Sequence, residues 1–297
     1  KHYAYMKISE GCDRPCSFCA IPLMRGKHVS KSIEDLVTEA KNLVRDGVKE
    51  IMLIGQDSTY YGIDLYGERR LHELMDRLSD IEGLEWIRLH YAYPSKFPFE
   101  VLPIMNSKPN ICKYLDIPIQ HISDNVLKSM RRGITKRRTE EVLDRIKAEV
   151  PGIALRTTLL VGHPGEYDQD FDELMEFVQH YQFNRLGVFT YSHEGGTHAG
   201  TLEDHVSATI KSARADEIMA LQHDISAMHN QALVGSNQRV LIDRVEGDSY
   251  IGRTQYDSPE VDNEVIISLN EGYYRLGDFV DTKIIKAEAF DLIAKPI

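Results

Sequence analysis

Cys12-Asp-Arg-Pro-Cys16-Ser-Phe18-Cys19 is the most informative segment of this 297-residue chain, because it holds three of the four cysteines. Cysteines clustered at the spacing Cys-x-x-x-Cys-x-x-Cys usually bind metal or carry out redox chemistry. Thiolates are the common ligands of a four-iron cluster, and three of them leave one iron without a protein ligand. The sequence therefore predicts an open iron–sulfur site at Cys12, Cys16 and Cys19.

A zinc site is the alternative for the same cysteines. Structural zinc usually takes four ligands from Cys or His, and the remaining cysteine, Cys112, lies near the predicted start of another strand. We interpret Cys112 as a small buried residue without a functional role. A non-catalytic, metal-stabilised binding module would be recognised by stoichiometric zinc and no iron.

The cysteine segment follows the first strand of an alternating βα pattern that extends from about residue 3 to residue 192. Strands are predicted at 3–9, 50–56, 86–93, 114–120, 153–161 and 185–191. Helices are predicted at 33–45, 71–78, 124–131, 138–149 and 168–181. Six such units predict an α/β fold, a partial (β/α)6 barrel, and parallel barrels carry their active sites at the carboxyl ends of the strands.

The chain changes character after residue 206. A long helix is predicted from 207 to 233, with Ile210, Ala213, Leu221, Ile225, Met228 and Ala232 at helical spacings. Short β-type runs follow at 239–245, 249–256, 264–269 and 279–289, and they predict a small antiparallel barrel. We expect two domains, residues 1–236 including the linking helix, and residues 237–297.

Charge and hydropathy narrow the partners and the compartment. The formal net charge is −11, and residues 237–297 hold twelve Asp and Glu against seven Lys and Arg. Direct binding to nucleic acid is not expected from such a surface, whereas a basic protein would be attracted. Solubility alone is the plainer explanation of the acidic surface.

No apolar run is long enough to span a membrane and no secretory signal is present, so a cytoplasmic protein is expected. The chain starts at Lys1, close to the first strand, which suggests an upstream segment.

The cysteine segment resembles the radical S-adenosylmethionine (SAM) signature, in which an aromatic residue, here Phe18, precedes the third cysteine. This resemblance implies a [4Fe–4S] cluster whose open iron binds the amino and carboxylate groups of SAM. It also implies that one electron cleaves SAM into methionine and a 5′-deoxyadenosyl radical, which abstracts hydrogen from carbon. Phe18 is then expected beside the adenine.

The resemblance covers essentially the whole chain and is closest to the methylthiotransferases of the RimO type. It is carried by Gly55-Gln56-Asp57-Ser58, Tyr91-Ala-Tyr93-Pro94 and Pro118-Ile-Gln120-His121-Ile-Ser123-Asp124. Such enzymes add an SCH3 group to the β-carbon of an aspartate in ribosomal protein S-twelve, and a TRAM barrel follows their radical SAM barrel. The related tRNA adenosine methylthiotransferases differ at all three segments and remain the alternative.

Polar residues at the strand ends are candidates for binding SAM beside Phe18. They are Gln56 and Asp57 after the second strand, Gln120, His121 and Ser123 after the fourth, and Arg156 within the fifth. Asp57 is also an ordinary turn residue and Ser123 an ordinary helix cap, and Arg156 could equally form a structural ion pair. No residue is predicted as a general acid or base.

His163 stands where the family usually has Phe, so the hydrophobic contact of that turn is in question. His193 and His198 are expected to be surface residues.

Full-length methylthiotransferases carry an N-terminal domain with a second [4Fe–4S] cluster, which this chain is expected to lack. The resemblance further implies an electron-donor protein and a basic small-subunit ribosomal protein as partners, the latter on the ribosome or free. Residues 1–297 alone are expected to cleave SAM without completing methylthiolation.

Overall fold

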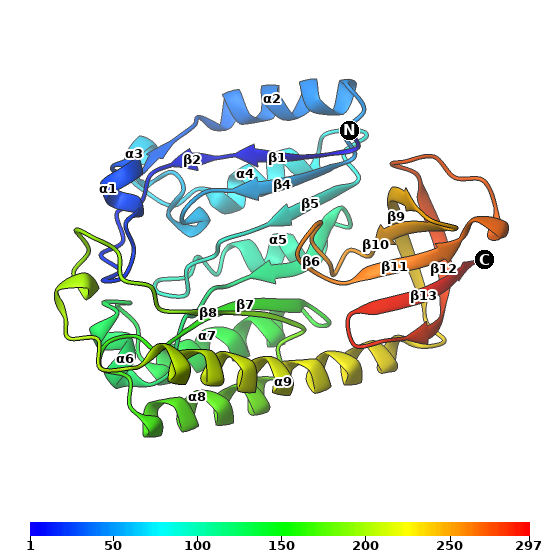
Figure 1. Ribbon diagram of the computed structural model, residues 1–297. Coiled ribbons are helices and arrows are strands. Elements are labelled where there is room, and N and C mark those ends of the chain that lie inside the picture. Colours follow the sequence, from blue (N-terminus) through cyan, green and yellow to red (C-terminus); the bar gives the residue numbers. More distant parts are fainter.

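The computed structural model describes all residues, 1–297, and its larger part is built on six parallel strands in an open sheet (Figure 1). In spatial order they are β1 (Tyr3–Lys7), β4 (Glu50–Ile54), β5 (Trp86–Leu89), β6 (Ile111–Asp116), β7 (Ala154–Val161) and β8 (Arg185–Thr190). Each strand pairs in parallel with its neighbour. The predicted partial (β/α)6 barrel is confirmed.

Helices cover the outside of this sheet. They are α1 (Ile21–Arg25), α2 (Ile33–Arg45), α3 (Ile63–Tyr66), α4 (Leu71–Ser79), α5 (Val101–Ser107), α6 (Asp124–Ser129), α7 (Lys136–Glu149) and α8 (Asp168–Tyr181). Ser32 and Thr135 cap α2 and α7 with their side chains, as expected for helix N-termini. A single apolar cluster of 43 buried residues fills the space between the helices and the sheet. The sequence did not predict α1, α3 or α5, which span seven residues or fewer, two of them containing proline.

The long helix α9 (Ala208–Leu233) runs beside β8 and reaches the small barrel (Figure 1). Its predicted position is confirmed, but the side that it buries is mainly polar. Arg214 pairs with Glu166, and Gln222 and Asn230 donate to backbone carbonyls. Ile210 and Met228, which helped to identify the helix, are about half exposed. No helix of the structure is both long and apolar enough to cross a membrane.

The small barrel is closed by five strands in the order β10-β11-β13-β12-β9. Their bounds are β9 (Asn237–Glu246), β10 (Ser249–Arg253), β11 (Glu264–Ser268), β12 (Phe279–Ala287) and β13 (Asp291–Pro296). The run predicted as one strand at 279–289 ends at Ala287, and β13 was not predicted. Because β13 turns back along β12, it runs in the same direction as β11, so one pair of this barrel is parallel rather than antiparallel.

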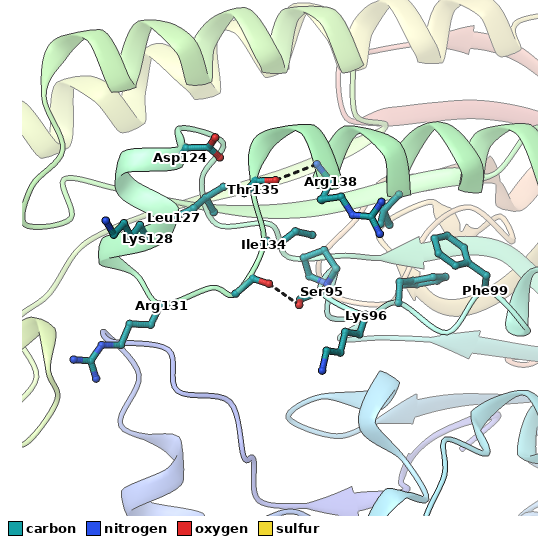
Figure 2. Close-up of a pocket in the computed structure, with 14 residues that line it drawn as sticks. Ser95, Lys96, Phe99, Asp124, Leu127, Lys128, Arg131, Ile134, Thr135 and Arg138 are labelled. Atoms are coloured by element: carbon teal, nitrogen blue, oxygen red, sulfur yellow. Dashed lines mark hydrogen bonds between the residues drawn. The ribbon is translucent and has the colours of Figure 1, made fainter.

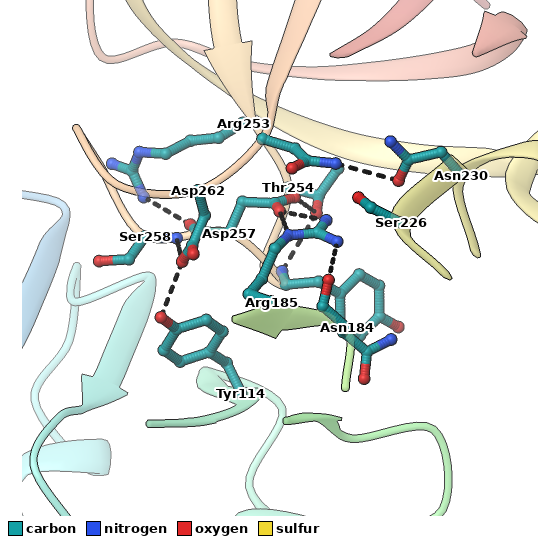
Figure 3. Close-up of polar contacts among 12 residues, drawn as sticks. Tyr114, Asn184, Arg185, Ser226, Asn230, Arg253, Thr254, Asp257, Ser258 and Asp262 are labelled. Carbon is teal, nitrogen blue, oxygen red and sulfur yellow. Dashed lines mark hydrogen bonds and ion pairs between the residues drawn. The ribbon is translucent and has the colours of Figure 1, made fainter. Parts of the chain in front are cut away.

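A loop of the small barrel enters the open sheet at the amino ends of its strands (Figure 3). This loop, residues 254–263, joins β10 to β11. Its Asp257 pairs with Arg185 at the start of β8, with oxygen to Nε at 2.8 Å. Its Asp262 accepts a hydrogen bond of 2.7 Å from Tyr114 in β6. Acidic residues of the small barrel therefore hold the two parts together at the edge opposite the carboxyl ends.

Two further contacts complete this interface. Glu50, which is fully buried, lies between Arg88 of β5 and Arg253 of β10. Cys112 is 1% exposed and packs with Trp86 and with Leu241 of β9. The prediction that Cys112 is a small buried residue is confirmed.

Candidate iron–sulfur site

The cysteine segment forms a loop at the carboxyl edge of the sheet, closed at its base by β2 (Ser9–Glu10) and β3 (Val29–Ser30). The backbone N–H of Cys12 donates to the carbonyl of Gly26 across this base, at 3.1 Å. Gly11 has a φ of +80°, and a β-carbon there would lie 2.1 Å from the carbonyl oxygen of Lys27. The narrow base therefore requires glycine, and it fixes where the cysteines begin.

Cys12, Cys16 and Cys19 line one cleft of about 630 Å³. No three His, Cys, Asp or Glu side chains of the chain are close enough to share a single ion. Thiolates of a four-iron cluster each bind a different iron and can lie farther apart. Burial raises the pKa of Cys12 to about 11 and also raises that of Cys19, so binding iron there means displacing protons. The donor set and the cleft fit a cluster better than a mononuclear site.

Arg14, inside the cysteine loop, ties that loop to the end of β4. Its Nε donates to Asp57 Oδ2 at 2.6 Å, and Asp57 is 1% exposed. The other oxygen of Asp57 accepts from the backbone N–H and the hydroxyl of Thr59, so this carboxylate also caps the 3-10 turn Ser58–Tyr60. Asp57, predicted as a SAM-binding candidate, thus holds the loop in place through Arg14.

Cys16 is contacted by side chains from the segments that follow β5 and α6. Tyr93, after β5, places its hydroxyl 3.4 Å from Cys16 Sγ, and Arg132, after α6, places Nη1 at the same distance. Ser17 is held at both sides, because its N–H donates to Met130 and its carbonyl accepts from Ala199. The segments that follow β5, α6 and β8 therefore all support the cysteine loop.

Phe18 and Gln56 lie beside the cleft rather than in its wall. The Phe18 ring packs against a buried apolar group that includes Met130, Leu160 and Tyr191. Gln56 donates to Glu10 at the base of the cysteine loop, at 3.0 Å. Both side chains are partly exposed, which leaves surface for a ligand.

The candidates after β6 connect the site to its supporting helices. Gln120 has a φ of +72° and bridges to Leu159 of β7 by backbone hydrogen bonds. His121 is fully buried, and its Nδ1 accepts the N–H of Ser123. Ser123 donates its hydroxyl to Asp170 of α8. His121 and Ser123 therefore form hydrogen bonds within the loop and to α8, and neither lines the cysteine cleft.

Arg156 lies five residues before the end of β7, far along the strand from the cysteines. Its guanidinium pairs with Asp116 at 3.0 Å and with Asp262 of the small-barrel loop at 3.3 Å. Of the two roles left open by the sequence, the structure supports the ion pair.

His163 keeps the packing contact of this turn, although it replaces the family's usual Phe. The imidazole is fully buried and lies edge-on to Phe18 and Tyr191. Its Nε2 is 3.2 Å from Ser17 Oγ, a hydrogen bond that phenylalanine could not form. His193 and His198 are exposed, as predicted, and His198 also lines the cysteine cleft, together with Gly196 and Thr197.

We expect acid to destabilise the fold through two buried histidines. Desolvation lowers the pKa of His121 to about 3 and that of His163 to about 4, against 6.5 in the unfolded chain. Below pH 6.5 the unfolded state binds more protons than the folded state, so stability falls as the pH falls toward 4. At pH 5 the loss is roughly 2 kcal/mol for each histidine, at about 1.4 kcal/mol per pKa unit.

The measurement is urea unfolding at pH 7.5 and pH 5 of the parent, of H163F and of H223F, since His223 is exposed. Between the two pH values, the unfolding free energy of H163F is expected to fall by about 2 kcal/mol less than that of the parent. That of H223F is expected to fall by as much as the parent's. Equal losses in all three proteins would contradict this assignment.

Figure 2 shows the residues that line a second cavity, of about 710 Å³. Arg131 lines both this cavity and the cysteine cleft. Its floor includes Phe97 and Leu127, which are buried. Lys96, Lys128 and Arg131 are exposed at its rim and form no ion pair. These three cations could not be predicted from the sequence, because no local pattern shows that the loop after β5 lies beside the end of α6.

Comparison with known proteins agrees with this architecture. Residues 6–178 match the family model of the radical SAM superfamily, and residues 234–297 match that of the TRAM domain. The ribosomal protein uS12 methylthiotransferase RimO of Flavobacterium johnsoniae is 58% identical over 296 residues, which cover 100% of this chain and 68% of that protein. The protein of the same name from Porphyromonas gingivalis is 56% identical over 297 residues, covering 99% and 68%.

Solved structures show the same fold at low identity. Coproporphyrinogen III oxidase (HemN) from Escherichia coli, a radical SAM enzyme, superposes with a TM-score of 0.54 at 17% identity, over 85% of this chain and 66% of that one. The radical SAM methyltransferase TsrM from Kitasatospora setae gives a TM-score of 0.52 at 18% identity, over 63% and 36%.

Proposed function

We propose that this chain, which belongs to the radical SAM methylthiotransferases of the RimO type, adds an SCH3 group to the β-carbon of an aspartate in ribosomal protein uS12. The relatives that are more than half identical to it carry that protein in their name. The observation that carries the proposal is the cleft at the carboxyl edge of the sheet, lined by all three cysteines of the loop. When bound, the cluster and SAM supply a 5′-deoxyadenosyl radical, which removes hydrogen from carbon.

We assign the residues of the site to three roles: binding the cluster, contacting SAM and holding the loops in place. Cys12, Cys16 and Cys19 would hold the cluster, and Asp57 would fix their loop through Arg14. Phe18, Gln56 and Gln120 are proposed to contact SAM from the side of the cleft, while His121 and Ser123 hold the loop after β6. Arg156 is proposed to act only in the ion pair with Asp116 and Asp262.

Charge supports a basic protein substrate more weakly than the sequence suggested. Of the twelve acidic residues in 237–297, Asp243, Asp257 and Asp262 pair with the arginines Arg253, Arg185 and Arg156 at the interface. The remaining acidic residues can still attract a basic protein by long-range complementarity. At the site itself, the exposed cations Lys96, Lys128 and Arg131 would suit the carboxylate of the target aspartate.

Several finer features are proposed with the function. We divide the chain into a radical SAM domain with its linking helix, residues 1–236, and a TRAM domain, residues 237–297. We propose that a second [4Fe–4S] cluster outside residues 1–297 and an electron-donor protein complete the reaction, which takes place in the cytoplasm, on the ribosome or on free uS12. The chain spans 68% of the length of the Flavobacterium johnsoniae protein.

The substrate can be tested by following hydrogen transfer, which does not require completed methylthiolation. The reconstituted protein would be incubated anaerobically with SAM, dithionite and uS12 carrying deuterium on the aspartate β-carbons. Deuterium is expected in the 5′-deoxyadenosine detected by mass spectrometry, because the radical abstracts hydrogen from that carbon. No methylthiolated product is expected from residues 1–297 alone.

Two controls separate this function from its alternatives. uS12 with deuterium only on the α-carbons is expected to give unlabelled 5′-deoxyadenosine. Unfractionated tRNA deuterated on adenosine tests the tRNA-modifying alternative. Label transferred from the tRNA and not from uS12 would overturn the proposed substrate, and efficient methylthiolation by residues 1–297 would refute the need for a second cluster.

A further inference from the structure

Arg132 is a buried cation without a carboxylate partner. The residue is 4% exposed, and it forms none of the ion pairs of the chain. A buried charge is costly unless an opposite charge and hydrogen bonds compensate it. Its Nη2 donates to the carbonyl of Pro118 at 2.5 Å, and its Nε has no partner. A carbonyl compensates only part of a full positive charge, so the guanidinium lacks a counter-charge.

The negative partner that the geometry offers is the sulfur of Cys16. Arg132 Nη1 lies 3.4 Å from Cys16 Sγ, within hydrogen-bonding distance for sulfur. The contrast with Arg14 is informative, because both guanidinium groups lie 4.1 Å from the centre of the Tyr93 ring. Arg14 is neutralised by Asp57, whereas Arg132 is not. A thiolate at Cys16 would supply the missing charge.

Tyr93 holds Arg132 in this position and leaves it as the donor to sulfur. The Tyr93 hydroxyl donates its proton to the backbone carbonyl of Arg132, at 2.9 Å. A phenol has one proton, so while this bond persists Tyr93 cannot also donate to Cys16. A Cys16 thiol can donate to the Tyr93 oxygen, but once iron replaces the thiol proton only the guanidinium can donate to the sulfur.

The turn after α6 explains how Arg132 reaches the site. Arg131 has a φ of +55°, and the N–H of Arg132 donates back to the carbonyl of Leu127. This left-handed turn reverses the chain, which leaves Arg131 exposed and Arg132 buried. Arg131 is therefore a matched control with the same charge, one residue away.

From these contacts we propose that Arg132 sets the reduction potential of the cluster by donating to the Cys16 sulfur, with Tyr93 as its positioning residue. The proposal rests on the proposed function, since it needs a cluster at the three cysteines. Reduction adds an electron, and a cation at a ligand sulfur stabilises the more negative state, which raises the potential. Removing the guanidinium is expected to make the cluster harder to reduce.

The test is a redox titration of the reconstituted cluster without SAM, monitored by electron paramagnetic resonance. In R132Q the ratio of reduced to oxidised cluster at a fixed potential is expected to fall at least tenfold, which is about 59 mV for a one-electron couple. R132K keeps the charge, and its ratio of reduced to oxidised cluster is expected to lie between those of R132Q and the parent. Y93F removes the hydrogen bond to the Arg132 carbonyl and is expected to lower this ratio by less than R132Q does.

R131Q removes the exposed charge and is expected to shift the ratio much less, because solvent screens it. An unchanged potential in cluster-loaded R132Q, or an equal shift in R131Q, would overturn this proposal while leaving the proposed function intact. If R132Q does not load a cluster, R132K and Y93F decide, and parental potentials in both would overturn it. Failure of the parent to form any cluster would instead overturn the proposed function, and this inference with it.

Discussion

Replacing Cys12, Cys16 and Cys19 together by alanine is expected to abolish both cluster binding and SAM cleavage. The three thiols line the same cleft, and no other Cys lies near it to substitute for them. After anaerobic reconstitution, iron is expected to fall from about four atoms per chain to background. Production of 5′-deoxyadenosine with dithionite is expected to fall to the level of a reaction without enzyme.

Cys112→Ala is the matched control for this experiment. Cys112 is buried against Trp86 and Leu241 at the interface with the small barrel, away from the cysteine loop. Its alanine variant is expected to keep the parental iron content and the parental rate of SAM cleavage. Cleavage that persists in the triple variant would refute the assignment of the cysteines. A parent with a full cluster and no cleavage would favour a binding module over an enzyme.

The sheet could be predicted because a buried parallel strand leaves a clear apolar run and its helix a clear amphipathic one. The bounds of α2 and α8 agree with the prediction to the residue. β13 was not predicted because its sequence, Asp-Leu-Ile-Ala-Lys-Pro, is short and has few β-branched residues. The turn before it, at Glu288–Phe290, contains neither glycine nor proline to mark it.

The site was predicted less completely, because a sequence shows which residues follow a strand but not where their side chains point. Asp57 and His121 both follow strands, yet Asp57 turns toward Arg14 and His121 toward Glu166. Arg132 was visible only as part of a helix end, and a left-handed residue before it determines its direction. Partners from distant segments, such as Asp262 for Arg156, could not be inferred from local pattern at all.

Asp257→Ala is expected to cost about 3 to 5 kcal/mol of unfolding free energy, the usual effect of removing one partner from a buried ion pair. Asp257 is 1% exposed and accepts two hydrogen bonds from Arg185 and one from Thr254 (Figure 3). Without it, the buried guanidinium of Arg185 keeps only the carbonyl of Asn184. The loss is expected to separate the small barrel from the sheet before either part unfolds, because this pair joins them.

Urea unfolding at pH 7.5 measures the effect, with Asp248→Ala as the control on an exposed turn of the same barrel. Asp248→Ala is expected to change stability by less than about 0.5 kcal/mol, as surface substitutions usually do. The double variant R185M/D257A is expected to recover part of the loss, because it removes the stranded charge along with its partner. A loss below about 1 kcal/mol in Asp257→Ala, a level typical of solvent-exposed pairs, would mean that the acidic loop does not hold the two parts together. In that case the acidic residues of this loop, Asp257 and Asp262, would need a role other than joining the small barrel to the sheet.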